Sequence, residues 1–501
     1  MSLRSWFAAA AISAFALVAA GAGAAATGAG DEFVIRSGSS LQLQGQPFRF
    51  SGPNIEWLGL EAYGPHDPIG ARYPSHFEVD DALDTAKAMG AKVVRAQTLG
   101  DSVGCDLCIE PRLGVFNPKA FASIDYTIAA AHKRGLRLIV TLAGDCATCE
   151  LSGPGEYLKW LGKREPKAFF TDRAVIAAYE AHIAAVLNHR NALTGVRYKD
   201  DPTIMAWENC NMCGLGVMWT ATSRDMGPYT PWIDTIGAFI KSIDRRHLYL
   251  DTTGFFRFDK RALDASTPDL VTWEYYPHWD SHLAGMKTTA ASFTRDAADV
   301  VAHGKAYIVN EYGWDVTDWK TPADFQLVLS ALEKDANISG DDYWALQAHA
   351  DNFGWQPIPA DTRNPLFAKL GESGQWWAMY FGGVDTLVNT KADMFEREQM
   401  LRRHAYAMAA TLTPPFPVPP APVVTTYGRG FIGWRGSAGA IAYSVQRRAN
   451  AADAWETICD HCATDADAPW PDPHPLGKLG VQYRVIAYNP DGVPSQPSSA
   501  P

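Results

Sequence analysis

The stretch that decides the fold is residues 306–314, with the sequence AYIVNEYGW. Its first four residues form an apolar run with the length and β-propensity of a fully buried strand. The run ends in a carboxylate, Glu311, which is followed by Gly313 and Trp314. In a parallel barrel the carboxyl ends of the strands face the open end where catalysis takes place, so this position predicts a catalytic Glu311. The structural alternative is an ion pair that only stabilises the fold.

Helical segments and short β-rich runs alternate on both sides of this stretch, as in a parallel sheet with crossover helices. The predicted strands are residues 48–50, 92–97, 137–142, 203–207, 247–251, 270–275, 306–309 and 342–346. The predicted helices are residues 79–89, 121–134, 172–190, 232–244, 291–303, 324–335 and 394–408. Eight strands predict an α/β (β/α)8 TIM barrel over residues 33–410, because a doubly wound sheet would be expected to carry an early Gly-rich dinucleotide turn.

The N-terminal segment has the features of an export signal. Arg4 supplies a positive charge, residues 8–20 are apolar, and small residues at 22–26 offer a cleavage site. We therefore expect residues 1–26 to be removed and the protein to be secreted or periplasmic. The sequence has no second apolar run long enough to span a membrane. Residues 33–50 then predict a small hairpin that closes the floor of the barrel.

The C-terminal region predicts a separate module. Residues 411–422 are rich in proline and indicate a stiff extended linker. Alternating residues at 431–434, 441–447 and 481–488 predict strands, followed by a turn at 489–492. The pattern resembles a small all-β fibronectin type III or immunoglobulin-like sandwich over residues 423–501. It carries no catalytic cluster, which favours a packing or spacer role.

Composition limits the function classes. The net charge of −11 argues against nucleic acid or another polyanion as a partner. The chain has 17 Trp, 19 Tyr and 22 Phe residues, whose flat faces suit stacking on sugar rings and equally suit a large core. We expect a monomer that binds a polysaccharide or oligosaccharide, has no membrane span and uses no cofactor.

The eight cysteines form four Cys-x-x-Cys pairs. Three pairs follow the second, third and fourth predicted strands and would meet at the mouth of the barrel. Disulfides are the expectation in an exported chain. The alternative is a soft-ligand site for zinc or Cu(I), made by six sulfurs together with Met212. The pairs are Cys105/Cys108, Cys146/Cys149, Cys210/Cys213 and Cys459/Cys462.

Five motifs occur in an order that resembles one enzyme family. They are FVIRSGSSLQLQGQPFRFSGPN at 33–54, VVRAQTLG at 93–100, DPTIMAWE at 201–208, EYYP at 274–277 and NEYG at 310–313. This order is similar to glycoside hydrolase family 5 and looks most like its endo-β-mannanase branch. The resemblance covers residues 33 to about 408.

The resemblance implies retaining chemistry with two carboxylates about 5 Å apart. Glu311 matches the nucleophile at the end of the seventh strand. Matching residues in relatives hold the charge of the nucleophile or line the sugar subsite. Here, the residues expected to bind substrate are Arg95, Asn211, Tyr276, His278, Trp344 and Trp57. The alternatives are that Arg95 only pairs with Glu208 and that Trp344 belongs to the core.

One position departs from the family pattern. Relatives carry Asn-Glu after the fourth strand, with Glu as the acid/base, whereas this chain has Met212 there. A thioether has no proton to give, and general acid/base catalysis contributes ~100- to 10,000-fold. Glu274, which stands where relatives commonly have His, is the first candidate for a relocated acid. Glu208 is expected to be structural, and Asp145 is a weaker candidate.

The sequence therefore predicts an exported glycoside hydrolase that acts on a β-linked polysaccharide, β-mannan or β-glucan. Two alternatives remain open at this point. The first is a carbohydrate-binding protein that kept the cleft and lost catalysis. The second is a barrel with a thiol or metal site at its mouth.

Overall fold

The computed structural model describes most of the chain. The described residues are 32–61, 71–144, 153–214, 229–254, 260–276, 286–313, 321–356, 378–385, 390–428, 430–465, 469–477 and 480–500. The expected signal segment lies outside these ranges. So do His278, Asp145 and the pair Cys146/Cys149.

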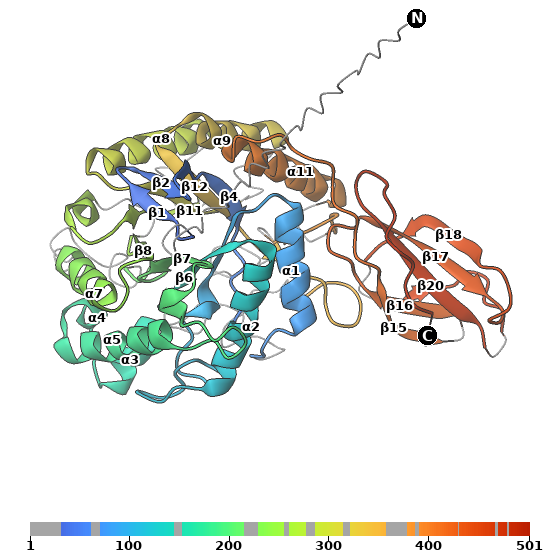
Figure 1. Cartoon of the computed structure of the whole chain (residues 1–501), viewed down its shortest axis with the longest axis horizontal. Coiled ribbons are helices and arrows are strands. Elements are labelled where there is room, and N and C mark those ends of the chain that lie inside the picture. The colour runs from blue at the N-terminus through green and yellow to red at the C-terminus, as the bar shows by residue number, and fades with distance from the viewer. Residues whose placement is uncertain are drawn as a thin grey trace, which may run out of the picture.

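Parallel strands form a closed ring, as the sequence predicts (Figure 1). One sheet has the order β5-β6-β7-β8-β9 and a second has the order β10-β11-β12-β4. Bridges between Asn54 and Arg95 and between Leu270 and Ala306 join the two sheets at both edges. The strands are β4 Phe50–Pro53, β5 Val93–Ala96, β6 Arg137–Thr141, β7 Ile204–Glu208, β8 Leu248–Asp251, β9 Leu270–Val271, β10 Glu274–Tyr275, β11 Tyr307–Gly313 and β12 Ile338–Trp344.

Helices cover the outside of this ring (Figure 1). Several begin about one turn before the predicted start, because the prediction used the first apolar residue whereas the capping residues precede it. Ser75 forms a capping box with Glu78 at the start of α1, and α2 ends at Gly135 with a φ of 71°. The helices are α1 His76–Ala88, α2 Pro118–Arg134, α3 Gly153–Trp160, α4 Ala168–Thr171, α5 Arg173–Asn188, α7 Tyr229–Ile243, α8 Met286–Ala302, α9 Pro322–Lys334 and α11 Lys391–Met408.

The interior of the ring is apolar below the site. Strand residues such as Phe50, Ile139 and Ile308 form one buried cluster. Val34 and Leu41 join that cluster from the small antiparallel sheet of β1 Ile35–Ser37, β2 Ser40–Leu43 and β3 Gln46–Pro47. This sheet therefore packs against the floor of the barrel, as expected. A larger apolar cluster lies between the strands and the helices.

The C-terminal region forms a β-module of two three-stranded antiparallel sheets. One has the order β15-β16-β19 and the other β18-β17-β20. Their strands are β15 Val423–Gly428, β16 Phe431–Arg435, β17 Ala442–Arg448, β18 Glu456–Ala463, β19 Trp470–Pro471 and β20 Gln482–Tyr488. Tyr443, Val445 and Val485 lie in its own apolar core. The likeness to a fibronectin type III fold remains a prediction.

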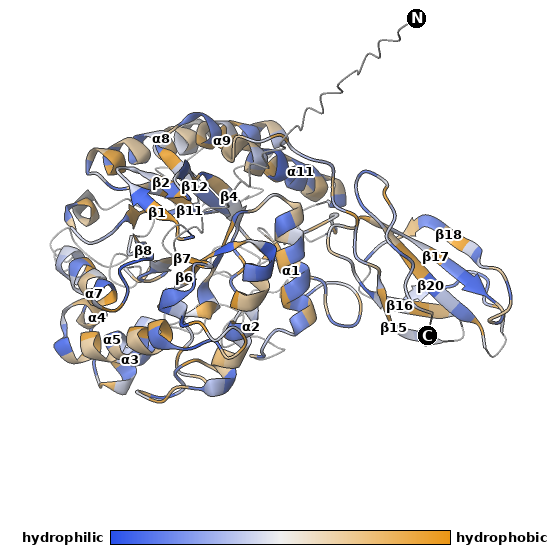
Figure 2. Ribbon diagram, viewed as in Figure 1, coloured by the Kyte–Doolittle hydropathy of each residue, from blue (hydrophilic) through white to orange (hydrophobic). Residues whose placement is uncertain are grey.

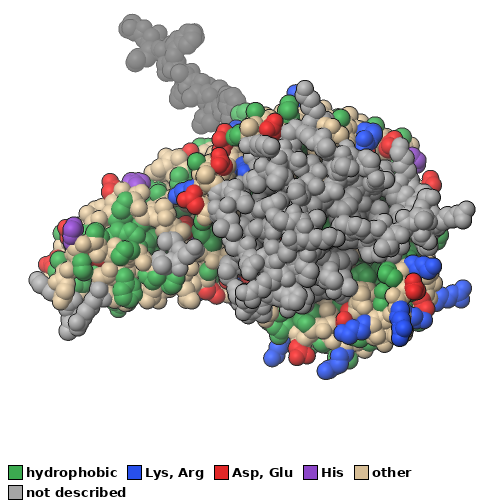
Figure 3. Space-filling model, turned by 180° about the vertical axis from the view of Figure 1, so that it is seen from behind, with side chains coloured by type: hydrophobic (Ala, Val, Ile, Leu, Met, Phe, Trp, Pro, Cys, Tyr) green, Lys and Arg blue, Asp and Glu red, His purple; other side chains and the backbone are tan. Residues whose placement is uncertain are grey.

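Polar and apolar residues are mixed along the outer helices (Figure 2). On the face seen in Figure 3, several Lys and Arg side chains gather at one edge of the barrel, with Asp and Glu among them.

Within the described ranges, no helix combines the length and the apolar character needed to cross a bilayer.

The buried His404 gives a test of how α11 is attached. Its imidazole lies between Asp341 of β12, at 2.9 Å, and Glu333 of α9, at 3.0 Å. Burial alone would lower the pKa of His404, but these carboxylates outweigh burial and raise the pKa to about 9. Because the folded-state pKa is raised, the stabilisation is complete below pH ~6.5 and is lost as the pH rises through about 9.

We expect His404→Gln to lower the free energy of unfolding by about 3 kcal/mol at pH 6, because a buried charge pair is broken. The difference from wild type should shrink above pH 9. Urea denaturation at pH 6, 8 and 10 measures it. His303→Gln, at the exposed end of α8, is the matched control and should change little. A difference that is the same at all three pH values would contradict the assignment.

Candidate active site

One guanidinium lies at the centre of the mouth of the barrel. Arg95 donates to both carboxylate oxygens of Glu208, at 2.8 and 2.6 Å. It also donates to Asn54 at 2.8 Å, to Glu311 at 2.6 Å and to Asn211 at 2.6 Å. Residues from three different strands or strand ends, β4, β7 and β11, therefore meet on the side chain of Arg95. A rigid, planar fork of N–H donors is suited to this, and an ammonium is not.

Arg95 and Glu208 are both fully buried. Burial alone would lower the pKa of Arg95, but Glu208 and Glu311 outweigh it and the pKa is raised well above its usual value. Glu208 also accepts hydrogen bonds from Thr141 at 2.7 Å and Thr252 at 2.6 Å. A buried ion pair is tolerated when its remaining hydrogen-bonding capacity is satisfied in this way. These contacts support the structural role expected for Glu208.

Glu311 lies near the carboxyl end of β11 and is only 4 % exposed. One of its oxygens accepts from Arg95, and the other accepts from the Tyr276 hydroxyl at 2.6 Å. Burial raises the pKa of Glu311 above its usual value, whereas Arg95 and Tyr276 act in the opposite direction. The carboxylate is therefore oriented by two donors and partly desolvated, which are properties of a nucleophile.

Glu274 is the direct neighbour of Glu311. The two residues are register partners on the adjacent parallel strands β10 and β11. Adjacent strands lie about 4.8 Å apart, so both side chains point into the barrel side by side. A hydrogen bond from the Glu274 carboxyl also lowers the pKa of Glu311. Glu274 therefore acts directly on the protonation of Glu311.

The segment after β7 carries Met212, at the position where the sequence resemblance implies an acid/base. Asn211 is tied back by a bond from its backbone N–H to the carbonyl oxygen of Ala143, at 2.9 Å. Met212 follows with a φ of 45° and is nearly buried. It lies inside the ring closed by the Cys210–Cys213 disulfide. The thioether is thus held at the mouth in a conformation that few side chains adopt.

Sequence reasoning missed two residues that follow β4. Asn54 accepts from Arg95 and bonds the carbonyl oxygen of Asp342 at 3.1 Å. Glu56 is buried, and burial and the negative charge of Glu311 raise its pKa to about 7, against an opposing backbone hydrogen bond. Both residues lie in residues 52–57, GPNIEW, and their spacing of two would place them on one side of an extended chain.

Comparison with known proteins places the chain in a family. A profile described as "GH family 5 beta-mannosidase-like" matches residues 31–260. Mannan endo-1,4-beta-mannosidase 5 of Solanum lycopersicum is 29 % identical over 235 residues, which are 45 % of this chain and 51 % of the tomato protein. A second relative is named "Putative mannan endo-1,4-beta-mannosidase 9" and comes from Oryza sativa subsp. japonica. It is 30 % identical over 356 residues, which are 64 % of this chain and 81 % of the rice protein.

The chain belongs to glycoside hydrolase family 5. It spans about half the length of the tomato relative and of several others. The fold agrees with that of the endo-1,4-beta-mannanase from Rhizomucor miehei, with a TM-score of 0.56 and 24 % identity. That alignment covers 76 % of this chain and all of the fungal chain.

Four of the predicted family 5 site residues meet around Glu311. Arg95, Asn211, Tyr276 and Glu274 are linked to one another or to Glu311 by the contacts given above. Trp344 is register partner of Gly313 at the end of β12 and is partly exposed. Trp57 is only 1 % exposed and packs in the apolar layer outside the ring, so its contact with sugar remains a prediction.

The disulfide interpretation holds for the three described cysteine pairs. Cys105–Cys108, Cys210–Cys213 and Cys459–Cys462 are all bonded. The alternative of a six-sulfur metal site is therefore wrong, because four of those six sulfurs are already in disulfides. Among the residues that the structure describes, no group of three or more His, Cys, Asp and Glu side chains is arranged to hold a metal ion.

Arg95→Lys tests the central network of this family 5 protein. Lysine keeps the charge but cannot bond both oxygens of Glu208 and reach Glu311 at the same time. We expect the free energy of unfolding to fall by about 3 kcal/mol, because a buried carboxylate loses its partner. Chemical denaturation measures this loss. Arg137→Lys in β6 is the control, since its bond to the carbonyl oxygen of Pro202 can be made by an ammonium. Equal effects of the two changes would contradict the central role of Arg95.

Proposed function

We propose that the protein is a retaining glycoside hydrolase that cleaves β-linked mannan. The observation that carries the proposal is the position of Glu311 near the carboxyl end of β11, where Arg95 and Tyr276 donate to its two oxygens, in a family 5 chain. A protein that only binds sugar has no need for a carboxylate prepared for attack. The names of the plant relatives support β-mannan, and β-glucan is the second substrate class to test.

In the first half of the proposed reaction, a Glu311 oxygen bonds to the anomeric carbon while the bond from that carbon to the glycosidic oxygen breaks. The leaving oxygen takes a proton from Glu274, which becomes a carboxylate. In the second half, Glu274 removes a proton from water, and the water oxygen displaces Glu311 from the anomeric carbon. Neighbouring carboxyl groups about 5 Å apart suit this double displacement.

Glu274 is proposed as the acid/base because it is the carboxyl group in direct register with Glu311. Met212 occupies the position that carries the proton donor in relatives and cannot exchange a proton. The raised pKa of Glu56, about 7, makes that residue the competing candidate. The two candidates make opposite predictions when each is replaced.

A dinitrophenyl β-mannoside separates the two roles, because its leaving group needs no protonation. We expect Glu311→Gln to abolish dinitrophenol release. Glu274→Gln should still release it in a burst, while hydrolysis of mannan falls at least ~100-fold because acid/base catalysis is lost. Azide, which needs no general base, should restore turnover of the aryl glycoside.

Glu56→Gln is the matched control and should leave both reactions within a few-fold of wild type. If Glu56→Gln instead slows mannan hydrolysis while dinitrophenol is still released, the acid/base is Glu56 and the assignment to Glu274 is wrong. If Glu311→Gln still releases dinitrophenol, the nucleophile is wrong.

Met212→Glu should restore the mannan hydrolysis that Glu274→Gln removes. In the Glu274→Gln background it restores a proton donor at the usual position, so we expect mannan hydrolysis to recover by ~100-fold or more. The backbone there already holds a side chain at a φ of 45°. Met212→Gln in the same background is the control, since it matches glutamate in size without an acidic proton. No difference between these two double variants would contradict a defect in proton donation.

A carbohydrate-binding protein without catalysis is the alternative, favoured by Met212. It predicts no dinitrophenol from any β-glycoside, together with oligosaccharide affinity in calorimetry that Glu311→Gln leaves unchanged.

We further propose export directed by residues 1–26, a monomeric state, and a fibronectin type III-like identity for the C-terminal module. The charge and apolar pattern of residues 1–26 supports export. The two packed antiparallel sheets support the identity of the module.

A further inference from the structure

The segment that follows β12 runs from the mouth of the barrel to the C-terminal module. It begins at Trp344, beside Gly313 of β11. Two residues later the backbone N–H of Leu346 donates to the backbone carbonyl oxygen of Asn54, whose side-chain oxygen accepts from Arg95. The segment then continues to Gln356, whose amide donates to Glu61 after β4, at 2.8 Å. Both ends of the segment are thus attached to the barrel.

The middle of this segment is held by His349, which lies between the two parts of the protein. Its Nδ1 is 3.0 Å from the Asp81 carboxylate of α1, and its backbone N–H bonds the same carboxylate at 2.9 Å. Its Nε2 is 3.1 Å from Asp465 of the C-terminal module. The imidazole is fully buried. A single side chain therefore links the barrel, the segment and the module.

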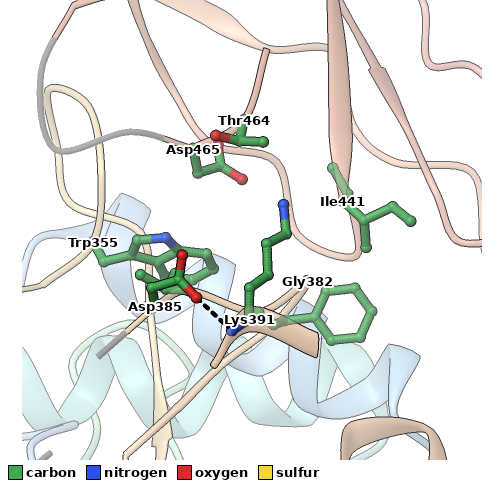
Figure 4. Close-up of a pocket in the computed structure, with 11 residues that line it drawn as sticks. Trp355, Gly382, Asp385, Lys391, Ile441, Thr464 and Asp465 are labelled. Carbon is green, nitrogen blue, oxygen red and sulfur yellow. Dashed lines mark hydrogen bonds between the residues drawn. The ribbon is translucent and has the colours of Figure 1, made fainter. Parts of the chain in front are cut away.

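The packing around His349 leaves little freedom. Trp355 stacks on the imidazole with ring centroids 3.9 Å apart. A Cβ on Gly436 of the module would lie 2.0 Å from the imidazole Cδ2, so only glycine allows this approach. Figure 4 shows Trp355 on one side of the interface and Asp465, Thr464 and Ile441 of the module on the other.

Two residues after His349, a second side chain of the segment contacts both the barrel and the module. Asp351 accepts from Ser75, the N-cap of α1, at 3.0 Å and lies 3.4 Å from Arg435 of β16. Thr425 of β15 donates to the carbonyl oxygen of Asn352. The module therefore contacts the segment at several places, and the contacts at His349 and Asp351 are each paired with one from the barrel.

We propose that His349 is a positioning residue, through which Asp465 of the C-terminal module fixes the segment that carries Trp344 at the sugar-binding mouth. This inference rests on the proposed function, because it gives Trp344 a role in holding substrate. The module then acts on the reaction through the barrel and needs no sugar contact of its own.

The charge state of His349 supports the link. Burial alone would lower its pKa, but Asp81 and Asp465 outweigh burial and raise the pKa to about 10. The group is therefore an imidazolium between two carboxylates at neutral pH. Removing one carboxylate leaves a buried charge with half of its compensation, which loosens the segment without removing an atom of the mouth.

Asp465→Asn in the full chain tests the inference. We expect hydrogen exchange at the amides of residues 346–350 to quicken about tenfold, because the local opening free energy falls by about 1.4 kcal/mol for each factor of ten. We expect the KM for mannan oligosaccharides to rise several-fold with kcat little changed, since substrate is held less firmly before and during reaction alike.

Asp472→Asn is the matched control. Asp472 accepts from Arg447 at 2.8 Å and Tyr483 at 2.9 Å within the module, so its loss weakens the module away from the segment. It should change neither exchange at 346–350 nor KM. His349→Gln should reproduce Asp465→Asn, and the double variant should add little, because both remove one link.

The outcomes separate this inference from the proposed function. Unchanged exchange in Asp465→Asn overturns the link, and faster exchange with an unchanged KM overturns the positioning role. If wild type hydrolyses no β-mannoside or β-glucoside, the proposed function fails. The same variants are then judged by their affinity for mannan oligosaccharides, and equal affinities overturn the inference.

Discussion

The structure depends on a cation buried inside a ring of strands. The buried guanidinium of Arg95 makes no hydrogen bonds to bulk water. The free-energy cost of this desolvation is offset only when its N–H donors bond fixed acceptors. Those acceptors come from the ends of the first, fourth and seventh strands of the ring and from the segment after the fourth. The same contacts therefore hold the ends of these strands together and build the site. Neither Glu208 nor Glu311 could be buried as an anion without Arg95.

The fold was predictable because the chain repeats one local pattern. Strands buried on both faces read as short apolar runs, and the helices between them show caps that the structure contains, such as Gly135 after α2. Glu311 could be predicted for the same reason, since a charge at the end of an apolar strand has few structural explanations. The motifs around it also supplied Arg95, Asn211 and Tyr276.

The remaining parts of the site depend on contacts between distant residues. Asn54 and Arg95 are separated by 41 positions and Arg95 and Glu311 by 216, so their meeting follows only from the closed ring. The register of Glu274 with Glu311 is likewise a property of the sheet. The raised pKa of Glu56 comes from burial, which no local pattern reports. The attachment of His349 to Asp465 needs both parts of the protein in place.

The disulfides close very short loops, and this limits what they contribute to the stability of the whole protein. Each described bridge joins residues three positions apart. A ring this small excludes few conformations of the unfolded chain, so it adds little to global stability and acts mainly on local shape. The barrel and the module each have an apolar core of their own. Any requirement for an oxidising environment therefore concerns the short loops that these bridges close, among them the loop that holds Met212.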